Sequence, residues 1–113
     1  ALQKLEFSHN QQISWICLTQ EEMQGQSPAG LIDEITFIEG IEMSILVIEK
    51  SDKRSKVSLR SRGKIDVSLF ASRLNPQGGG HQRAAGASLS LPLSQATLYV
   101  KRELALFLNE FPL

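Results

Sequence analysis

Residues 41–50, Ile-Glu-Met-Ser-Ile-Leu-Val-Ile-Glu-Lys, decide the fold of this chain. The centre of this run is apolar without interruption, which predicts a strand that is buried on both faces and therefore central in a sheet. A polar turn over 51–55 leads to residues 56–62, where polar and apolar side chains alternate. Alternation predicts a second strand with one face on the core. The other face of this strand carries Lys56, Ser58, Arg60 and Arg62.

Strand and helix signals alternate on both sides of this pair. A buried strand over 13–18 precedes the Thr-x-x-Glu spacing of a capping box, which predicts a short helix starting after Thr19. Ser27-Pro28 predicts the start of a helix that ends near Gly40, and Asp66 is expected to cap a helix that ends before Asn75-Pro76. Pro92 begins a last helix, whose Phe and Leu stripe is expected to be core. The interleaving predicts an α/β fold: a single domain with a mixed β-sheet packed with helices.

Composition limits the class of protein. The chain has 113 residues, enough for one ordinary domain, and its 42% hydrophobic and 21% charged residues are typical of a folded protein. No apolar run approaches the roughly 20 residues of a membrane span, and no signal-peptide pattern opens the chain. A cytoplasmic protein without a membrane partner is therefore expected. The one cysteine, Cys17, lies in an apolar run, which favours a buried, inert thiol over a nucleophile.

Residues 78–86, Gly-Gly-Gly-His-Gln-Arg-Ala-Ala-Gly, carry the strongest binding signal. Glycines expose backbone N–H groups, so we expect those of Gly79, Gly80 and His81 to converge on one anion where a short helix begins. This helix is expected over 81–85, with Gly86 closing it. The His81 imidazole can donate to the same anion, and the planar guanidinium of Arg60 can grip a phosphate with two hydrogen bonds.

The charge distribution supports an anionic ligand. Residues 50–83 contain nine of the twelve Lys and Arg but two of the twelve Asp and Glu, a net charge of +7, whereas the rest of the chain carries −7. The glycine-rich block lies inside this basic third. For the lysines and arginine over 50–56, a solvated hairpin tip is the preferred interpretation.

The parts of a self-sufficient hydrolase are not readable. The two histidines, His9 and His81, are far apart in sequence. Asp33 and Glu34 are expected to form a solvated helix face, and no Gly-Lys-Ser/Thr follows the glycines as a P-loop requires. We therefore assign no catalytic residue and no metal ligand in this chain.

The block at 78–86, with Val-Ser-Leu-Arg-Ser at 57–61 and Ile-Asp-Val-Ser at 65–68, resembles the C-terminal, DHH-associated substrate-binding domain of the DHH phosphoesterases. The resemblance covers roughly residues 13 to 111. It is greatest for the bifunctional oligoribonucleases that also dephosphorylate 3′-phosphoadenosine 5′-phosphate, and for the related cyclic-dinucleotide phosphodiesterases. It implies a hydrolase in which an N-terminal domain with an Asp-His-His motif binds manganese, while this domain holds the nucleotide.

The resemblance also implies roles for particular residues. The substrate-binding residues carried over are Arg60, Gly78, Gly79, Gly80 and His81. Residues 1–12 are interpreted as a lead-in from the missing N-terminal catalytic domain, and 13–113 as the DHH-associated substrate-binding domain. Short RNA or a phosphorylated nucleotide is the expected partner, and the fragment alone is expected to be inactive. The chain departs from the family at 74–77, where Leu-Asn-Pro-Gln replaces the usual Phe-Gly.

Three alternatives remain open. The first is the corresponding domain of a RecJ-type single-strand exonuclease, which would favour long single-stranded DNA. The second is a non-catalytic nucleic-acid-binding module, like the related C-terminal part of alanyl-tRNA synthetases; that relative lacks a histidine at the place of His81. The third is a regulatory domain that binds a nucleotide messenger without turnover.

Overall fold

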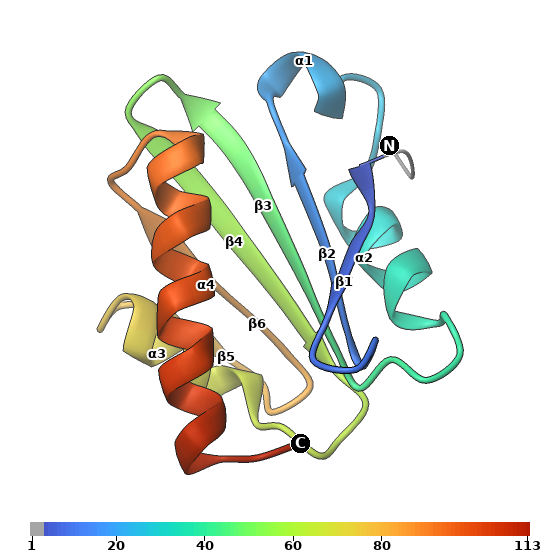
Figure 1. Ribbon diagram of the computed structural model, residues 1–113. Coiled ribbons are helices and arrows are strands. Elements are labelled where there is room, and N and C mark those ends of the chain that lie inside the picture. Colours follow the sequence, from blue (N-terminus) through green and yellow to red (C-terminus); the bar gives the residue numbers. More distant parts are fainter. Residues whose placement is uncertain (1–3) are drawn as a thin grey trace.

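A computed structural model describes residues 4–113 of the chain and contains a six-stranded sheet and four helices (Figure 1). The α/β fold predicted from the sequence is confirmed. In chain order the elements are β1 (Glu6–Ser8), β2 (Ile13–Leu18), α1 (Gln20–Met23), α2 (Pro28–Thr36), β3 (Met43–Ser51), β4 (Arg54–Ser61), α3 (Val67–Leu74), β5 (Gly79–Gly80), β6 (Ala84–Leu89) and α4 (Leu93–Glu110).

The sheet is mixed, with strand order β1-β2-β3-β4-β6-β5. β2 and β3 are parallel because α2 lies between them in the chain, and the other neighbouring pairs are antiparallel. β3 lies in the interior of the sheet and six of its nine residues are buried, as the uninterrupted apolar run predicts. β3 and β4 form the predicted hairpin, whose tip carries Asp52 and Lys53.

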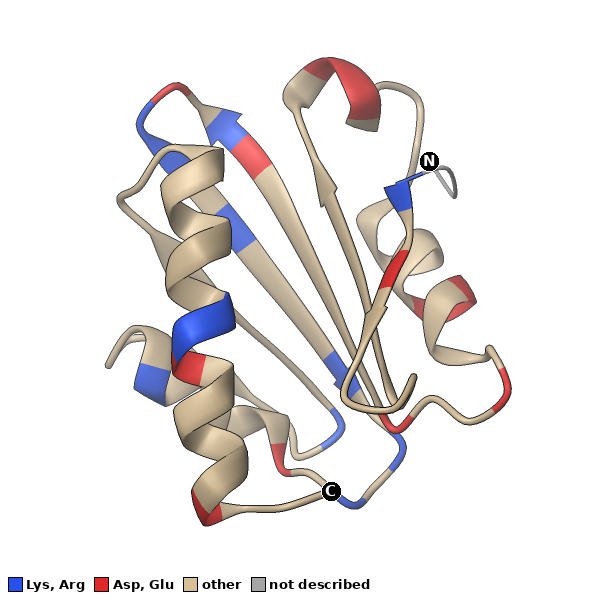
Figure 2. Ribbon diagram, in the orientation of Figure 1, with Lys and Arg blue, Asp and Glu red and all other residues tan. Residues whose placement is uncertain are grey.

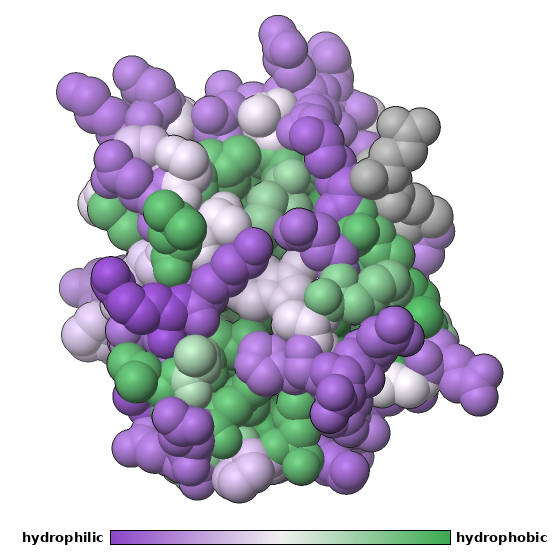
Figure 3. Space-filling model, in the orientation of Figure 1, coloured by the Kyte–Doolittle hydropathy of each residue, from purple (hydrophilic) through white to green (hydrophobic). Residues whose placement is uncertain are grey.

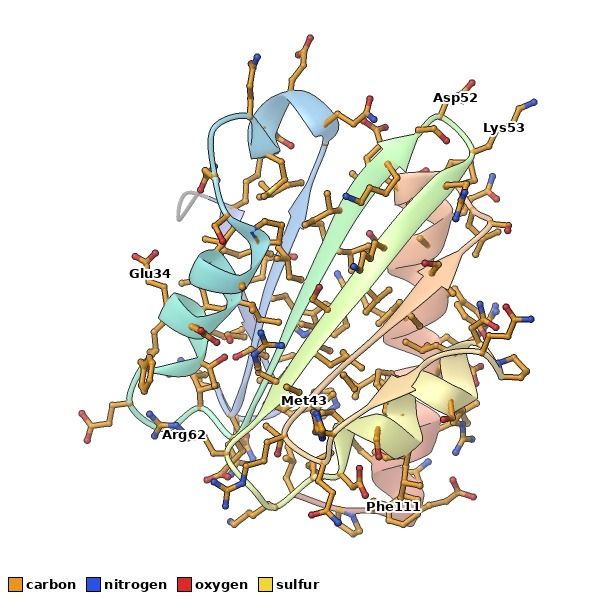
Figure 4. The ribbon with its side chains drawn as sticks, turned by 180° about the vertical axis from the view of Figure 1, so that it is seen from behind. Glu34, Met43, Asp52, Lys53, Arg62 and Phe111 are labelled. Atoms are coloured by element: carbon orange, nitrogen blue, oxygen red, sulfur yellow. The ribbon has the colours of Figure 1, made fainter. Side chains whose placement is uncertain are left out.

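Helices cover the two faces of the sheet unequally. α3 and α4 lie on one face over the larger apolar cluster, which draws on β2, β3, β4 and β6 (Figure 1). α2 lies on the opposite face over a smaller cluster, whose buried members come from β2, β3 and α2 (Figure 4). α2 also reaches β4 on that face, where Asp33 pairs with Arg60, whereas β6 and β5 carry no helix there. On the α4 side, apolar and hydrophilic side chains alternate over the surface (Figure 3).

The predicted caps form in the structure. Thr19 accepts a hydrogen bond from the Glu22 backbone N–H at 3.2 Å, and the Glu22 carboxylate accepts one from the Thr19 N–H at 2.9 Å, which completes the capping box. Ser27 caps α2 through the Gly30 N–H, and Asp66 caps α3 through the Ser68 N–H. These side chains satisfy backbone donors that a helix leaves unpaired at its start, so the helices begin where the sequence predicts.

The Phe and Leu stripe of the last helix is mostly core. α4 buries Ala96, Val100, Leu104 and Phe107 against the sheet. Phe111 lies just past the helix end and is 44% exposed, with its ring 4.8 Å from the Phe107 ring.

The prediction of a short helix over 81–85 is wrong. Residues 84–89 form β6, which pairs with β4 over six consecutive residues and with the two-residue strand β5 on its other side. Gly86 lies within this strand and does not end a helix. A Cβ at Gly86 would lie 2.9 Å from the Val57 carbonyl oxygen of the neighbouring strand, so the small residue permits the pairing. Local composition favoured a turn or helix, but ladder hydrogen bonds to β4 decided the conformation.

Part of the expected lead-in belongs to the sheet. Glu6–Ser8 pairs antiparallel with β2 as its edge strand β1, and residues 1–3 lie outside the described part of the chain. Among the helices of residues 4–113, none combines the length and apolar character that crossing a membrane requires.

Candidate functional site

Arg60 and the glycine-rich segment lie along one surface of the sheet, which we call the open face. It is the surface of β4, β6 and β5 that points away from α3 and α4, and it is visible from behind in Figure 4. Cross-strand pairing sets its layout, because residues directly opposite each other share a face. The pairs across β4 and β6 are Lys56 with Ser88, Ser58 with Gly86, and Arg60 with Ala84. Small residues therefore occupy its middle, with a cation at each end of the β4 row.

Ala84 brings Arg60 and His81 to the same level of the sheet. On one side Ala84 is the register partner of Arg60. On the other side its carbonyl accepts a hydrogen bond from the His81 N–H at 2.7 Å, and its N–H donates to the His81 carbonyl at 3.3 Å. Strands lie about 4.8 Å apart, so the Arg60 and His81 backbones lie about 10 Å apart across the open face. A long arginine and an exposed histidine can reach one phosphate group between them.

Not all backbone N–H groups of the glycine-rich segment are free to bind an anion. The His81 N–H is used by Ala84, and the Gly78 N–H donates to the Asn75 carbonyl at 2.7 Å, so the prediction that the His81 N–H binds an anion is wrong. The physical reason is that two turns use these donors: the turn over 81–84, which joins β5 to β6, uses the His81 N–H, and the turn over 75–78 uses the Gly78 N–H. Hydrogen-bonded and non-bonded pairs alternate in an antiparallel ladder. Gly80, paired with Ala85 next to the bonded His81–Ala84 pair, therefore directs its N–H to the outer edge of β5.

Close packing explains two of the three glycines. A Cβ at Gly78 would lie 2.6 Å from the Ala71 carbonyl oxygen of α3, and a Cβ at Gly80 would lie 2.7 Å from the Ala84 carbonyl oxygen. Gly80 also has a φ of +147°, which residues other than glycine rarely adopt. A Cβ at Gly79 would meet nothing within 4 Å. Gly79 therefore faces open space beside the open face.

Two hollows lie along the open face, the second of them where the end of α2 meets β4. The first, of about 390 Å³, is lined by Lys56, Asn75, Gln77, Gly78, Gly79, Gly86, Ala87 and Ser88. The second, of about 490 Å³, is lined by Asp33, Thr36, Phe37, Arg60, Ser61, Arg62, Arg83 and Ala84. The predicted binding residues are thus divided: the first two glycines line one hollow and Arg60 the other, while Gly80 and His81 line neither.

Arg60 is held in place by an acid that sequence analysis assigned to a solvated helix face. Its Nε lies 3.1 Å from Oδ1 of Asp33 on α2, and its Nη1 donates to the Leu59 carbonyl at 3.2 Å. The Arg60 side chain is 25% exposed and that of Asp33 is 54% exposed, so the pair contributes at most about 1 kcal/mol to stability. These contacts use two of the five guanidinium N–H donors and leave the others for a ligand.

Several residues that line the hollows are not among the binding residues predicted from the sequence. Lys56 was interpreted as part of a solvated hairpin tip, yet it lines the first hollow, and its alternation with Arg60 along β4 was an available signal. Phe37 falls within the helix that was expected to end near Gly40, whereas α2 ends at Thr36 with Phe37 as its C-cap. It lies two residues past Ile35, about 200° around a helix, and this spacing signals the opposite face. Arg62 and Arg83 join it at the second hollow because two loops meet there, which no local pattern reports.

Titratable side chains form no further constellation in the described part of the chain. Among residues 4–113, no three His, Cys, Asp or Glu side chains are grouped so that they could hold a metal ion. Burial raises the pKa of the Cys17 thiol, although a hydrogen bond from the Thr97 hydroxyl partly opposes this shift. A raised pKa lowers the thiolate fraction, and Cys17 lies on the α4 side of the sheet, away from both hollows.

Comparisons with known proteins agree with this architecture. Residues 12–110 match the family described as the DHHA1 domain. None of the curated proteins matches the chain. The crystal structure of an exopolyphosphatase-related protein from Bacteroides fragilis is similar, with 25% identity and a TM-score of 0.80 over 94% of this chain and 32% of that one. An uncharacterized protein from Helicobacter pylori G27 shares the fold at 19% identity and a TM-score of 0.52, over 96% of this chain and 29% of that one. The chain thus spans about a third of the length of each solved structure.

Proposed function

Because this chain belongs to the DHHA1 domain family, we propose that it is the substrate-binding domain of a phosphoesterase that hydrolyses short RNA or phosphorylated nucleotides. One observation carries the proposal: Arg60 and His81 lie on either side of Ala84, at one level of the open face. Arg60 would bind a phosphate through its free guanidinium edge, and the His81 imidazole would donate to the same group. Small residues between them leave room for the sugar-phosphate backbone.

The family resemblance assigns the reaction itself to a separate domain. That N-terminal domain would hold manganese, whose Lewis acidity polarises the phosphoryl group. The residues of this chain do not fit a metal site, as no group of three suitable side chains occurs within 4–113. Its residues therefore act on the substrate by binding it, orienting it and compensating its charge. Gly79 and Lys56, at the first hollow, would contact the part of the ligand that extends away from Arg60.

A titration of the 113-residue chain tests this proposal. Amide signals are followed by NMR while 3′-phosphoadenosine 5′-phosphate or 5′-phosphorylated diadenylate is added. We expect shifts at Arg60, Gly79, Gly80 and His81. Hydrogen bonds to charged groups contribute about 1.5–3 kcal/mol, so Arg60→Ala or His81→Ala should weaken binding about 10- to 100-fold.

Arg102→Ala is the matched control for Arg60→Ala, because Arg102 lies on α4 across the sheet and its substitution removes the same charge. Binding that is unchanged in both test variants, with native-like spectra, would contradict the proposal. A series of single-stranded DNA lengths separates the alternatives: affinity that keeps rising far beyond a dinucleotide favours a RecJ-type exonuclease domain.

Linear polyphosphate is a second candidate substrate. The similarity to a protein described as exopolyphosphatase-related favours it. The basic side chains of the open face would bind a chain of phosphates as well as they bind a nucleic-acid backbone. Nucleotide and tripolyphosphate titrations, run in parallel at the same ionic strength, distinguish the two.

A further inference from the structure

An exposed aromatic side chain stands beside the arginines of the second hollow. Phe37 is the C-cap of α2 and is 77% exposed, the most exposed of the large hydrophobic side chains within residues 4–113. It lines the hollow together with Arg60, Arg62 and Arg83. A single exposed apolar residue is ordinary on a protein surface. An aromatic ring that lines one hollow together with three arginines is a more specific combination.

Packing gives no reason for an aromatic residue at this position. α2 is held against β2 and β3 by Leu31, Ile32 and Ile35, which are buried. Phe37 follows on the other side of the helix axis and is not among the residues packed on either apolar cluster. The ring is therefore not needed to anchor α2, and it is available for contact with a ligand.

The arginines around Phe37 are positioned by backbone contacts. The Ser61 N–H donates to the Arg83 carbonyl at 2.9 Å, and the Arg62 N–H donates to the Glu42 carbonyl at 2.9 Å. These bonds fix the loops that present both side chains at the end of the sheet. Figure 2 shows basic residues gathered at the lower end of β4 and in the neighbouring loops, and Figure 4 shows Arg62 beside the loop that follows α2.

The charge of the hollow suits a chain of phosphates. Asp33 is its one acidic lining residue among those described, and its carboxylate is paired with Arg60. Arg62 and Arg83 are both exposed. Proteins that bind single-stranded nucleic acid combine cations along the backbone with aromatic rings on which bases stack. Inorganic polyphosphate offers nothing to stack on an aromatic ring.

We propose that Phe37 is a stacking platform for the nucleobase next to the phosphate at Arg60, so that the site takes a dinucleotide or single-stranded nucleic acid and not inorganic polyphosphate. The inference rests on the proposed function for the phosphate contact of Arg60. Arg62 and Arg83 bind the adjacent phosphate, and the ring of Phe37 covers one face of the base that follows.

The test compares ligands with and without bases. The 113-residue chain and its Phe37→Ala, Phe37→Trp, Arg60→Ala and Leu98→Ala variants are titrated with three ligands: 5′-phosphorylated diadenylate, the same molecule with one base removed, and tripolyphosphate. Leu98 is the matched control, because it is 69% exposed on α4, across the sheet. Phe37→Ala should weaken diadenylate binding about 5- to 100-fold, the effect of losing one base–aromatic stack.

The base-free ligands provide the decisive contrast. Phe37→Ala should not change the affinity for tripolyphosphate, and its effect should vanish on the dinucleotide that lacks the stacked base. Phe37→Trp should retain binding. The fluorescence of the new tryptophan should be quenched when the base stacks on it, while the contribution of buried Trp15 stays constant. Leu98→Ala should bind like the parent chain.

The outcomes separate the two proposals. If Arg60→Ala weakens diadenylate binding and Phe37→Ala does not, the stacking inference is overturned and the proposed function stands. If Phe37→Ala weakens tripolyphosphate binding equally, its effect is not stacking and the inference is again overturned. If diadenylate does not bind the parent chain while tripolyphosphate does, both proposals are overturned.

Discussion

The two faces of β4 and β6 differ in composition, although both are built from alternating residues of the same two strands. On the side of α3 and α4 these strands present Val57, Leu59, Ala87 and Leu89, all buried. On the open face they present Lys56, Ser58, Arg60, Ala84, Gly86 and Ser88, all at least partly exposed. The covered side is apolar and stabilises the fold. The open side is small, polar and basic, a surface suited to an anionic ligand rather than to another helix.

The largest expected effect separates two neighbouring residues of β4. Leu59→Ala should lower the free energy of unfolding by about 2–5 kcal/mol, because it leaves a cavity under α3 and α4. Ser58→Ala, on the open face, should stay within about 0.5 kcal/mol of the parent chain. Urea denaturation followed by circular dichroism measures both. Comparable losses in the two variants would mean that the open face also contributes to the core.

A second comparison tests whether the glycines of the open face are structural. Gly80→Ala forces a Cβ to within 2.7 Å of the Ala84 carbonyl oxygen at a φ of +147°, which should destabilise the chain by about 1–3 kcal/mol. Gly30→Ala is the control, since a Cβ in α2 meets nothing closer than 3.7 Å and should stabilise the helix by about 0.5–1 kcal/mol. The shift of the thermal unfolding midpoint shows whether each substitution stabilises or destabilises the chain. A Gly80→Ala variant as stable as the parent would show that β5 adapts to the methyl group.

The smallest expected effect concerns the acid that faces Arg60. Asp33→Asn keeps an oxygen that can accept from Arg60 Nε but removes the negative charge beside the phosphate site. Affinity for 3′-phosphoadenosine 5′-phosphate at low salt should rise about 2- to 5-fold, in line with a surface charge contribution of up to about 1 kcal/mol. Asp52→Asn at the hairpin tip makes the same charge change away from both hollows. If affinity falls in Asp33→Asn, the main role of Asp33 is to orient Arg60.

Local patterns predicted most of the elements. The capping box at Thr19, the caps at Ser27 and Asp66, and the alternation over 56–62 act through neighbours in sequence, and each element forms as these patterns indicate. The wrong prediction of a helix over 81–85 has a non-local cause. Alanine and glycine impose little local preference at that place, so pairing with β4, far away in sequence, decided that these residues enter a turn and a strand.

The candidate site was predicted in its parts but not in its arrangement. Arg60, His81 and the glycines were selected by residue type and spacing, whereas their binding roles remain predictions. The ion pair of Arg60 with Asp33 depends on how α2 crosses the sheet, and the His81 N–H is lost to the turn that it closes. Both follow from contacts between segments that the sequence pattern does not join.

The sequence by itself determined which residues form a core and which carry charge, because a period of two along a strand and caps at helix ends are local properties. It also determined the family resemblance, through the glycine-histidine block. Only the tertiary structure decided that α2 leaves β6 and β5 uncovered on one face, and that β6 inserts between β4 and β5. That insertion aligns Arg60 of β4, Ala84 of β6 and His81 in the turn after β5. The physical reason is that strands pair through backbone hydrogen bonds. Almost every residue carries these donors and acceptors, so the sequence of side chains does not specify locally which strands pair, and the whole fold decides it.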